Sequence, residues 1–127
     1  MAVLLHGGFW RDRYGRGLME ALCADLASRG WAAWNLEYRR LGSGGGWPAT
    51  FADVALGIDR LAGLAGEAPL DLGRVAAVGH SAGGHLALWA AARPALPAEA
   101  PGAVPAVLMH AVVSQAGSSR WSRWGGR

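Results

Sequence analysis

The sequence contains no lysine, a single cysteine and no long apolar run. One cysteine, Cys23, cannot form an internal disulfide, and it fits a reducing compartment. A membrane-spanning helix needs about 20 consecutive apolar residues, and the opening residues lack the charged segment of a secretory signal. We therefore expect a cytoplasmic protein that neither binds nor spans a membrane.

Positive charge is scarce in the body of the chain. All 12 basic residues are arginines, and three of them, Arg120, Arg123 and Arg127, lie in the last eight positions. Residues 1–117 hold nine arginines against nine acidic residues, so no basic face is left to bind nucleic acid. Without lysine there is no Walker-type phosphate loop. The histidines and the cysteine show no metal-ligand spacing, and we expect neither a metal nor a cofactor.

Short apolar runs alternate with amphipathic segments along the chain. At 127 residues and 52% hydrophobic content, the chain is long enough for one domain with a core. The alternation predicts an α/β fold, a three-layer sandwich whose mostly parallel sheet of about four strands is covered by helices on both faces. Residues 1–117 form this domain, and residues 118–127 form an irregular tail. The expected strands are 2–5, 31–38, 75–78 and 106–114, and the expected helices are 18–28, 48 or 50 to 64, and 82 to 93.

One stretch has the pattern of a catalytic nucleophile. Gly79-His80-Ser81-Ala82-Gly83 lies between an apolar strand and an Ala/Leu-rich helix. In such a Gly-x-Ser-x-Gly turn the serine hydroxyl stands above the sheet edge, and only glycine fits two positions to either side. Ser81 is therefore predicted to occupy a nucleophile position. The alternative is a glycine-flanked turn without chemistry.

A second glycine turn follows the first strand, in His6-Gly7-Gly8-Phe9-Trp10. Both turns lie at the carboxyl ends of parallel strands, where ligands bind in open α/β sheets. The backbone N–H groups of Gly7, Gly8 and Ala82 would suit a developing oxyanion. His6 is expected to shape this loop. Trp10 and Trp47 lie on loops at the same end, and they either line a substrate pocket or cover the core.

These two motifs together resemble the α/β-hydrolase fold, and within it the esterase/lipase and kynurenine formamidase-like branch. The segments Asn35-Leu36-Glu37-Tyr38-Arg39 and Gly45-Gly46-Trp47-Pro48 are also similar to that branch. The resemblance covers residues 2–117. It implies a strand order of second, first, third, fourth. It also implies Ser81 as nucleophile, the Gly7, Gly8 and Ala82 amides as oxyanion hole, and a small acyl ester or amide as substrate.

The other two members of a catalytic triad are not evident. In this family an aspartate or glutamate and then a histidine follow the serine. After Ser81 the only acid is Glu99, and the only histidines are His85 and His110. Glu99 is expected at the opposite end of the sheet, His110 inside a strand, and His85 packed on its helix. We therefore expect a hydrolase truncated after its nucleophile half, weak or inactive alone.

A second hypothesis is a non-catalytic hydrolase fragment or interaction module. Two edges of the sheet would be open, and exposed strand edges pair readily with other chains. This hypothesis predicts self-association or completion by a partner chain.

Overall fold

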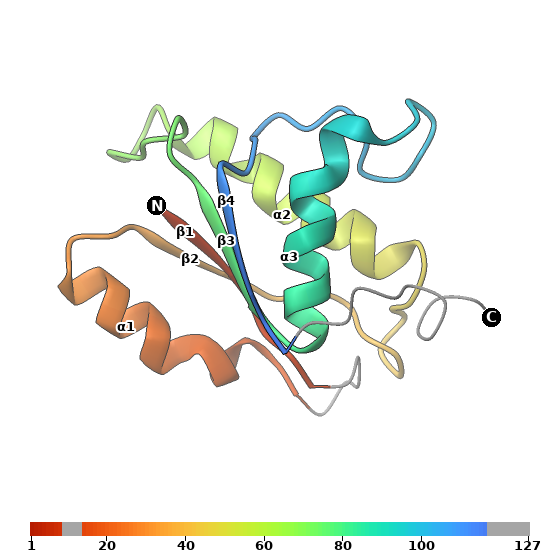
Figure 1. Ribbon diagram of the computed structural model, residues 1–127, viewed down its shortest axis with the longest axis horizontal. Helices are drawn as coiled ribbons and strands as arrows, with labels where there is room; N and C mark the ends of the chain where they lie inside the picture. Colours follow the sequence, from red (N-terminus) through yellow and green to blue (C-terminus); the bar gives the residue numbers. More distant parts are fainter. Residues whose placement is uncertain (9–13, 117–127) are drawn as a thin grey trace.

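Four short parallel strands form the central sheet of the computed structural model, which describes residues 1–8 and 14–116. Their order in the sheet is β2-β1-β3-β4, which confirms the expected order (Figure 1). The register pairs Leu5 with both Leu36 and Gly79, so three strands end side by side. The strands are β1 (Ala2–Leu5), β2 (Ala33–Leu36), β3 (Ala76–His80) and β4 (Ala111–Gln115).

Helices cover both faces of this sheet, as predicted. On one face lies α1 (Glu20–Ser28), which follows a 3-10 turn, η1 (Arg16–Met19). On the other face lie α2 (Ala49–Leu64) and α3 (Ala82–Ala92), which continues into η2 (Arg93–Ala95) (Figure 1). No helix within residues 1–8 and 14–116 is long and apolar enough to cross a membrane.

The central strand β1 is buried on both faces because its side chains alternate between two cores. Ala2 and Leu4 pack towards α1, whereas Val3 and Leu5 pack towards α2 and α3. All four residues are at most 1% exposed. This double burial explains why the strand is apolar at every position, as central parallel strands are.

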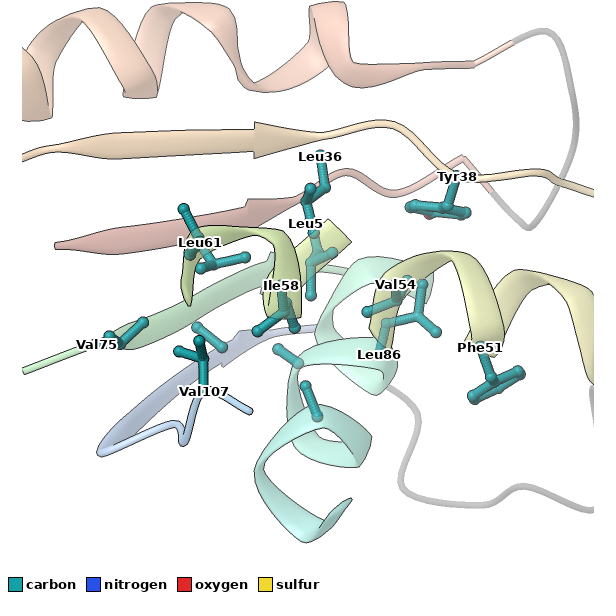
Figure 2. Close-up of a cluster of buried hydrophobic side chains, with 14 of the residues drawn as sticks. Leu5, Leu36, Tyr38, Phe51, Val54, Ile58, Leu61, Val75, Leu86 and Val107 are labelled. Atoms are coloured by element: carbon teal, nitrogen blue, oxygen red, sulfur yellow. The ribbon is translucent and has the colours of Figure 1, made fainter. Parts of the chain in front are cut away.

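The larger core lies between the sheet and the pair α2 and α3. Val54, Ile58 and Leu61 follow one another at helical spacing on α2 and are fully buried. Figure 2 shows them meeting Leu5 of β1 and Leu86 of α3. The sequence also suggested Leu56 as part of this stripe, which is wrong: it is 71% exposed, because it falls on the outer face of α2.

Two strands are shorter than expected. β2 spans four residues because it is an edge strand that pairs only with the four residues of β1. Trp31, the first residue of the expected strand, lies outside it and is exposed. β4 begins at Ala111 rather than at 106, because the backbone N–H groups of Ala106 and Val107 donate to Asp59 instead of to a strand.

A buried ion pair ties the end of α3 to α2. The Arg93 side chain is 1% exposed. Its Nη1 and Nη2 donate to Asp59 at 3.1 and 2.6 Å, and its Nε donates to the Gly102 carbonyl at 2.6 Å. Asp59 also accepts the N–H groups of Ala106 and Val107. This carboxylate therefore connects α2 with the end of α3 and with the loop before β4.

Candidate active site

Ser81 occupies a strained backbone position between β3 and α3. Its φ of 55° and ψ of −118° lie outside the regions that side-chain-bearing residues prefer, at a typical cost of about 1–3 kcal/mol. Two backbone hydrogen bonds hold it there: the Ser81 N–H donates to Gln115 at 2.7 Å, and the His85 N–H donates to the Ser81 carbonyl at 3.1 Å. The residue therefore stands at a sharp strand-to-helix turn, as the motif predicts.

The glycines of the motif are required by close backbone contacts. A Cβ on Gly79 would overlap the carbonyl of Gly83, and a Cβ on Gly83 would overlap the carbonyl of Leu5. The first helical turn of α3 is thus pressed against both β3 and the end of β1. The pattern predicted from the sequence has a steric cause in the fold.

The second glycine turn lies directly beside Ser81. β1 and β3 are neighbours in the sheet, so the residues that follow them meet. A Cβ on Gly7 would lie 3.1 Å from Ser81 Cβ and 2.6 Å from the His80 carbonyl oxygen. Gly8 has a φ of +124°, which favours glycine. Gly7 therefore lies against Ser81, and Gly8 and Ala82 follow these two residues along the chain. The catalytic roles of all four residues are predictions.

His6 shapes this glycine loop through a buried polar network. Its ring is fully buried, lies stacked on Tyr38 at 4.3 Å, and is 2.8 Å from both Glu37 Oε1 and the Gly7 carbonyl oxygen. The Tyr38 hydroxyl donates to the His6 carbonyl at 2.6 Å, and Arg40 pairs with Glu37. Sequence reasoning gave Glu37 no role. The position of Glu37 could have suggested one: it directly follows β2, and β2 pairs with β1, so Glu37 is expected near His6.

The hydrogen bonds around Glu37 set its pKa. Partial burial acts to raise the pKa of this carboxyl, but the N–H groups of Arg16 and Tyr38 and the ring of His6 all stabilise the charged form. Their combined effect holds the pKa below its ordinary value. Burial by contrast raises the pKa of the Tyr38 hydroxyl, so it stays a neutral hydrogen-bond donor.

A pH dependence of stability follows from the lowered pKa of Glu37. The folded protein keeps this carboxylate charged at a pH where the unfolded chain binds a proton. Its stabilisation is therefore present above the ordinary glutamate value of ~4.3 and is lost as the pH falls through the folded value. In urea titrations from about pH 6 to about pH 3, the free energy of unfolding should fall less steeply for Glu37→Gln than for the wild type. Equal slopes would contradict this linkage.

Of the two tryptophans assigned to the substrate site, Trp10 lies outside the described residues. Trp47 is 50% exposed and contacts Phe51 edge-to-face at 5.0 Å. It lines an apolar groove of about 430 Å³ that follows α3 from His85, one turn beyond Ser81. The groove is lined by Trp47, Phe51, His85, Leu88, Trp89, Ala92 and Leu96.

The downstream acid and histidines do not gather at Ser81. His110 precedes β4, and its Nδ1 is 3.3 Å from the Val75 N–H at the start of β3. Since a strand rises ~3.3 Å per residue, it lies about 20 Å from the Ser81 end of the sheet. Glu99 is exposed in the loop before β4, and the His85 ring faces Phe51. Ser81, Glu99 and His110 therefore do not form a triad.

Comparisons with known proteins identify the family and the fold of this chain. The BD-FAE family model matches residues 1–121. A crystal structure of Lactobacillus rhamnosis esterase B, inhibited by a tributyrin phosphonate, is 30% identical with a TM-score of 0.77 and aligns over 87% of this chain and 36% of its own. The Thermogutta terrifontis esterase Est2 with bound butyrate is 28% identical with a TM-score of 0.72, over 87% of this chain and 40% of its own.

A bacterial heroin esterase is also similar, with 28% identity and a TM-score of 0.61, over 68% of this chain and 27% of its own. No match was found among curated proteins. The chain spans well under half the length of these three solved structures.

Proposed function

Because the chain belongs to the BD-FAE family of α/β-hydrolase esterases, we propose that Ser81 is the nucleophile of an ester-hydrolysing site. The N–H groups of Gly7, Gly8 and Ala82 form its oxyanion hole. The observation that supports this most is the backbone of Ser81, whose φ of 55° is held at a sharp turn directly against Gly7. Strain of this kind is retained at functional sites when the surrounding structure over-determines it.

The reaction that fits this arrangement is acyl transfer in two steps. The Ser81 oxygen attacks the ester carbonyl, and the negative charge that develops on the carbonyl oxygen is received by preorganised N–H groups. The alcohol leaves with a proton, and water then hydrolyses the acyl-serine bond. The serine proton must pass to a general base within hydrogen-bond distance. Ser81, Glu99 and His110 form no triad, and in the nearby His6–Glu37 pair both ring nitrogens of His6 already face Glu37 and the Gly7 carbonyl, so turnover by this chain alone should be slow.

The substrate we propose is a small acyl ester. The esterase neighbours support this class, since one holds butyrate and another a tributyrin phosphonate. Trp47 and the groove along α3 offer an apolar wall that begins at His85, one helical turn from Ser81. A small amide of the formamidase type is the alternative substrate, and comparing p-nitrophenyl acetate with formanilide separates the two.

The test is covalent labelling of the full chain by a p-nitrophenyl phosphonate. The wild type should acquire one phosphonyl group on Ser81, found by peptide mass spectrometry, and hydrolyse p-nitrophenyl acetate above background. Oxyanion binding without a complete triad still gives about 10³–10⁴-fold acceleration over water. Ser81→Ala should lose both properties, whereas Ser28→Ala, at the end of α1, should keep them. Equal labelling and equal hydrolysis in Ser81→Ala would refute a working Ser81.

A non-catalytic module is the second candidate, favoured because Ser81, Glu99 and His110 do not form a triad. Its binding surface would be an open sheet edge: β4 is an edge strand, and Val113 on it is 47% exposed. Sedimentation of the wild type tests this idea. A concentration-dependent dimer would support it, and a stable monomer that unfolds cooperatively would argue against obligate pairing.

A further inference from the structure

His6 is fully buried, and both of its ring nitrogens face oxygen atoms. Nδ1 lies 2.8 Å from the Gly7 carbonyl oxygen, and Nε2 lies 2.8 Å from Glu37 Oε1. A carbonyl or an ionised carboxylate has no proton to donate, so each nitrogen must supply the proton for its own hydrogen bond. A ring that donates from both nitrogens is an imidazolium with a positive charge.

The groups around the ring are consistent with this charge. Glu37 is held ionised by the N–H groups of Arg16 at 3.0 Å and Tyr38 at 3.1 Å, and by the Arg40 guanidinium. Arg40 Nη1 is 3.5 Å from His6 Nε2, too far to replace the 2.8 Å bond to the carboxylate. Tyr38 faces the ring at an interplanar angle of 6° and is neutral, so its aromatic face favours a cation.

The hydrogen bond between His6 Nδ1 and the Gly7 carbonyl fixes the orientation of the Gly7–Gly8 peptide. The Gly7 carbonyl and the Gly8 N–H belong to the same planar unit, and in a trans peptide they point in opposite directions. Binding the carbonyl to His6 Nδ1 therefore turns the Gly8 N–H away from His6. Because both residues are glycines with wide backbone freedom, this hydrogen bond restricts the rotation of the peptide. A flipped peptide would place a carbonyl oxygen where the oxyanion develops.

We propose that Glu37 is a positioning residue of the esterase site: it holds His6 doubly protonated, and His6 in turn holds the Gly7–Gly8 peptide with its N–H towards the space above Ser81. The inference rests on the proposed function of Gly8 as an oxyanion donor. A positive ring one residue before the glycines also adds a favourable potential for the developing negative charge.

The first test does not need activity. In the full chain labelled with ¹⁵N, two-bond ¹H–¹⁵N correlations should show protons on both His6 ring nitrogens at neutral pH. In Glu37→Gln the ring should become neutral and keep its proton on Nε2, because the glutamine oxygen still accepts there. The Gly7 carbonyl then loses its donor on Nδ1, and the Gly8 amide signal should move. Asp71→Asn, which removes an exposed carboxylate at the opposite end of the sheet, should leave both signals in place. A singly protonated wild-type ring overturns the proposal, even if Glu37→Gln does not fold.

The second test measures the rate of phosphonyl transfer to Ser81. Losing one oxyanion donor typically slows catalysis ~10²–10³-fold, so Glu37→Gln should react roughly 10²-fold more slowly than the wild type and Asp71→Asn equally fast. Equal rates for Glu37→Gln and the wild type overturn the positioning role. A wild type that shows the protonated ring but never reacts refutes the esterase proposal and leaves the Glu37–His6 pair intact.

Discussion

Replacing Gly83 by alanine should lower the free energy of unfolding by about 3 kcal/mol or more. The added methyl would overlap the Leu5 carbonyl and lie 2.5 Å from the His6 carbonyl oxygen. Both obstacles are backbone atoms of the central strand and the loop after it, and neither can rotate aside. Helix α3 would have to move off the sheet, which loosens the turn at Ser81. Urea unfolding followed by circular dichroism measures the loss.

A matched control exists in the same protein. Gly63 also lies in a helix, α2, but a Cβ added there has nothing within 4 Å. Gly63→Ala should therefore stabilise the protein by about 0.5–1 kcal/mol, because alanine loses less backbone entropy in a helix. A Gly83→Ala variant as stable as the wild type would show that α3 does not contact β1 this closely.

Removing the carboxylate of Asp59 should cost about 3–5 kcal/mol. Asp59→Ala would leave the Arg93 guanidinium 1% exposed and without its ionic partner, and would orphan the N–H groups of Ala106 and Val107. An uncompensated buried charge costs far more than the pair contributes when intact. Thermal and urea unfolding of the variant measure this cost.

A double variant separates the cost of the uncompensated Arg93 charge from the cost of the lost hydrogen bonds. Asp59→Leu combined with Arg93→Met removes both charges, so the part of the loss that comes from the uncompensated charge should return. The part that comes from the unpaired Val107 N–H and Gly102 carbonyl should remain. Asp71→Ala removes a carboxylate that pairs with Arg74 in solvent, and it should change the unfolding free energy very little. Equal losses for Asp59→Ala and Asp71→Ala would mean that burial at Arg93 does not matter.

Much of the fold follows from local pattern. The alternation of short apolar runs with amphipathic helices specifies a parallel sheet with helices on both faces, because each crossover between parallel strands must be long and right-handed. The hydrophobicity of a residue does not by itself predict whether its side chain is buried. Trp31 and Leu56 are apolar yet exposed, whereas Arg93 is charged yet buried. In each case the neighbours in space, which the order of residues along the chain does not reveal, decide the environment.

In the candidate site, too, some features follow from residue type and others only from tertiary structure. The glycines around Ser81 and the pair Gly7 and Gly8 are recognisable from residue type alone, because only glycine tolerates such close backbone contacts and positive φ angles. The amino-acid sequence by itself therefore predicts Ser81, Gly7, Gly8 and Ala82 as site residues.

The support for the glycine loop depends on tertiary structure. Glu37 and His6 are 31 residues apart, and only the pairing of β1 with β2 brings their side chains to 2.8 Å. A local pattern cannot reveal such a contact, since the bond depends on strand register rather than on spacing. Residue types thus determine where this protein carries its candidate nucleophile and its glycine turns. Strand register and burial decide how the loop is held, because hydrogen bonds form between groups that are adjacent in space.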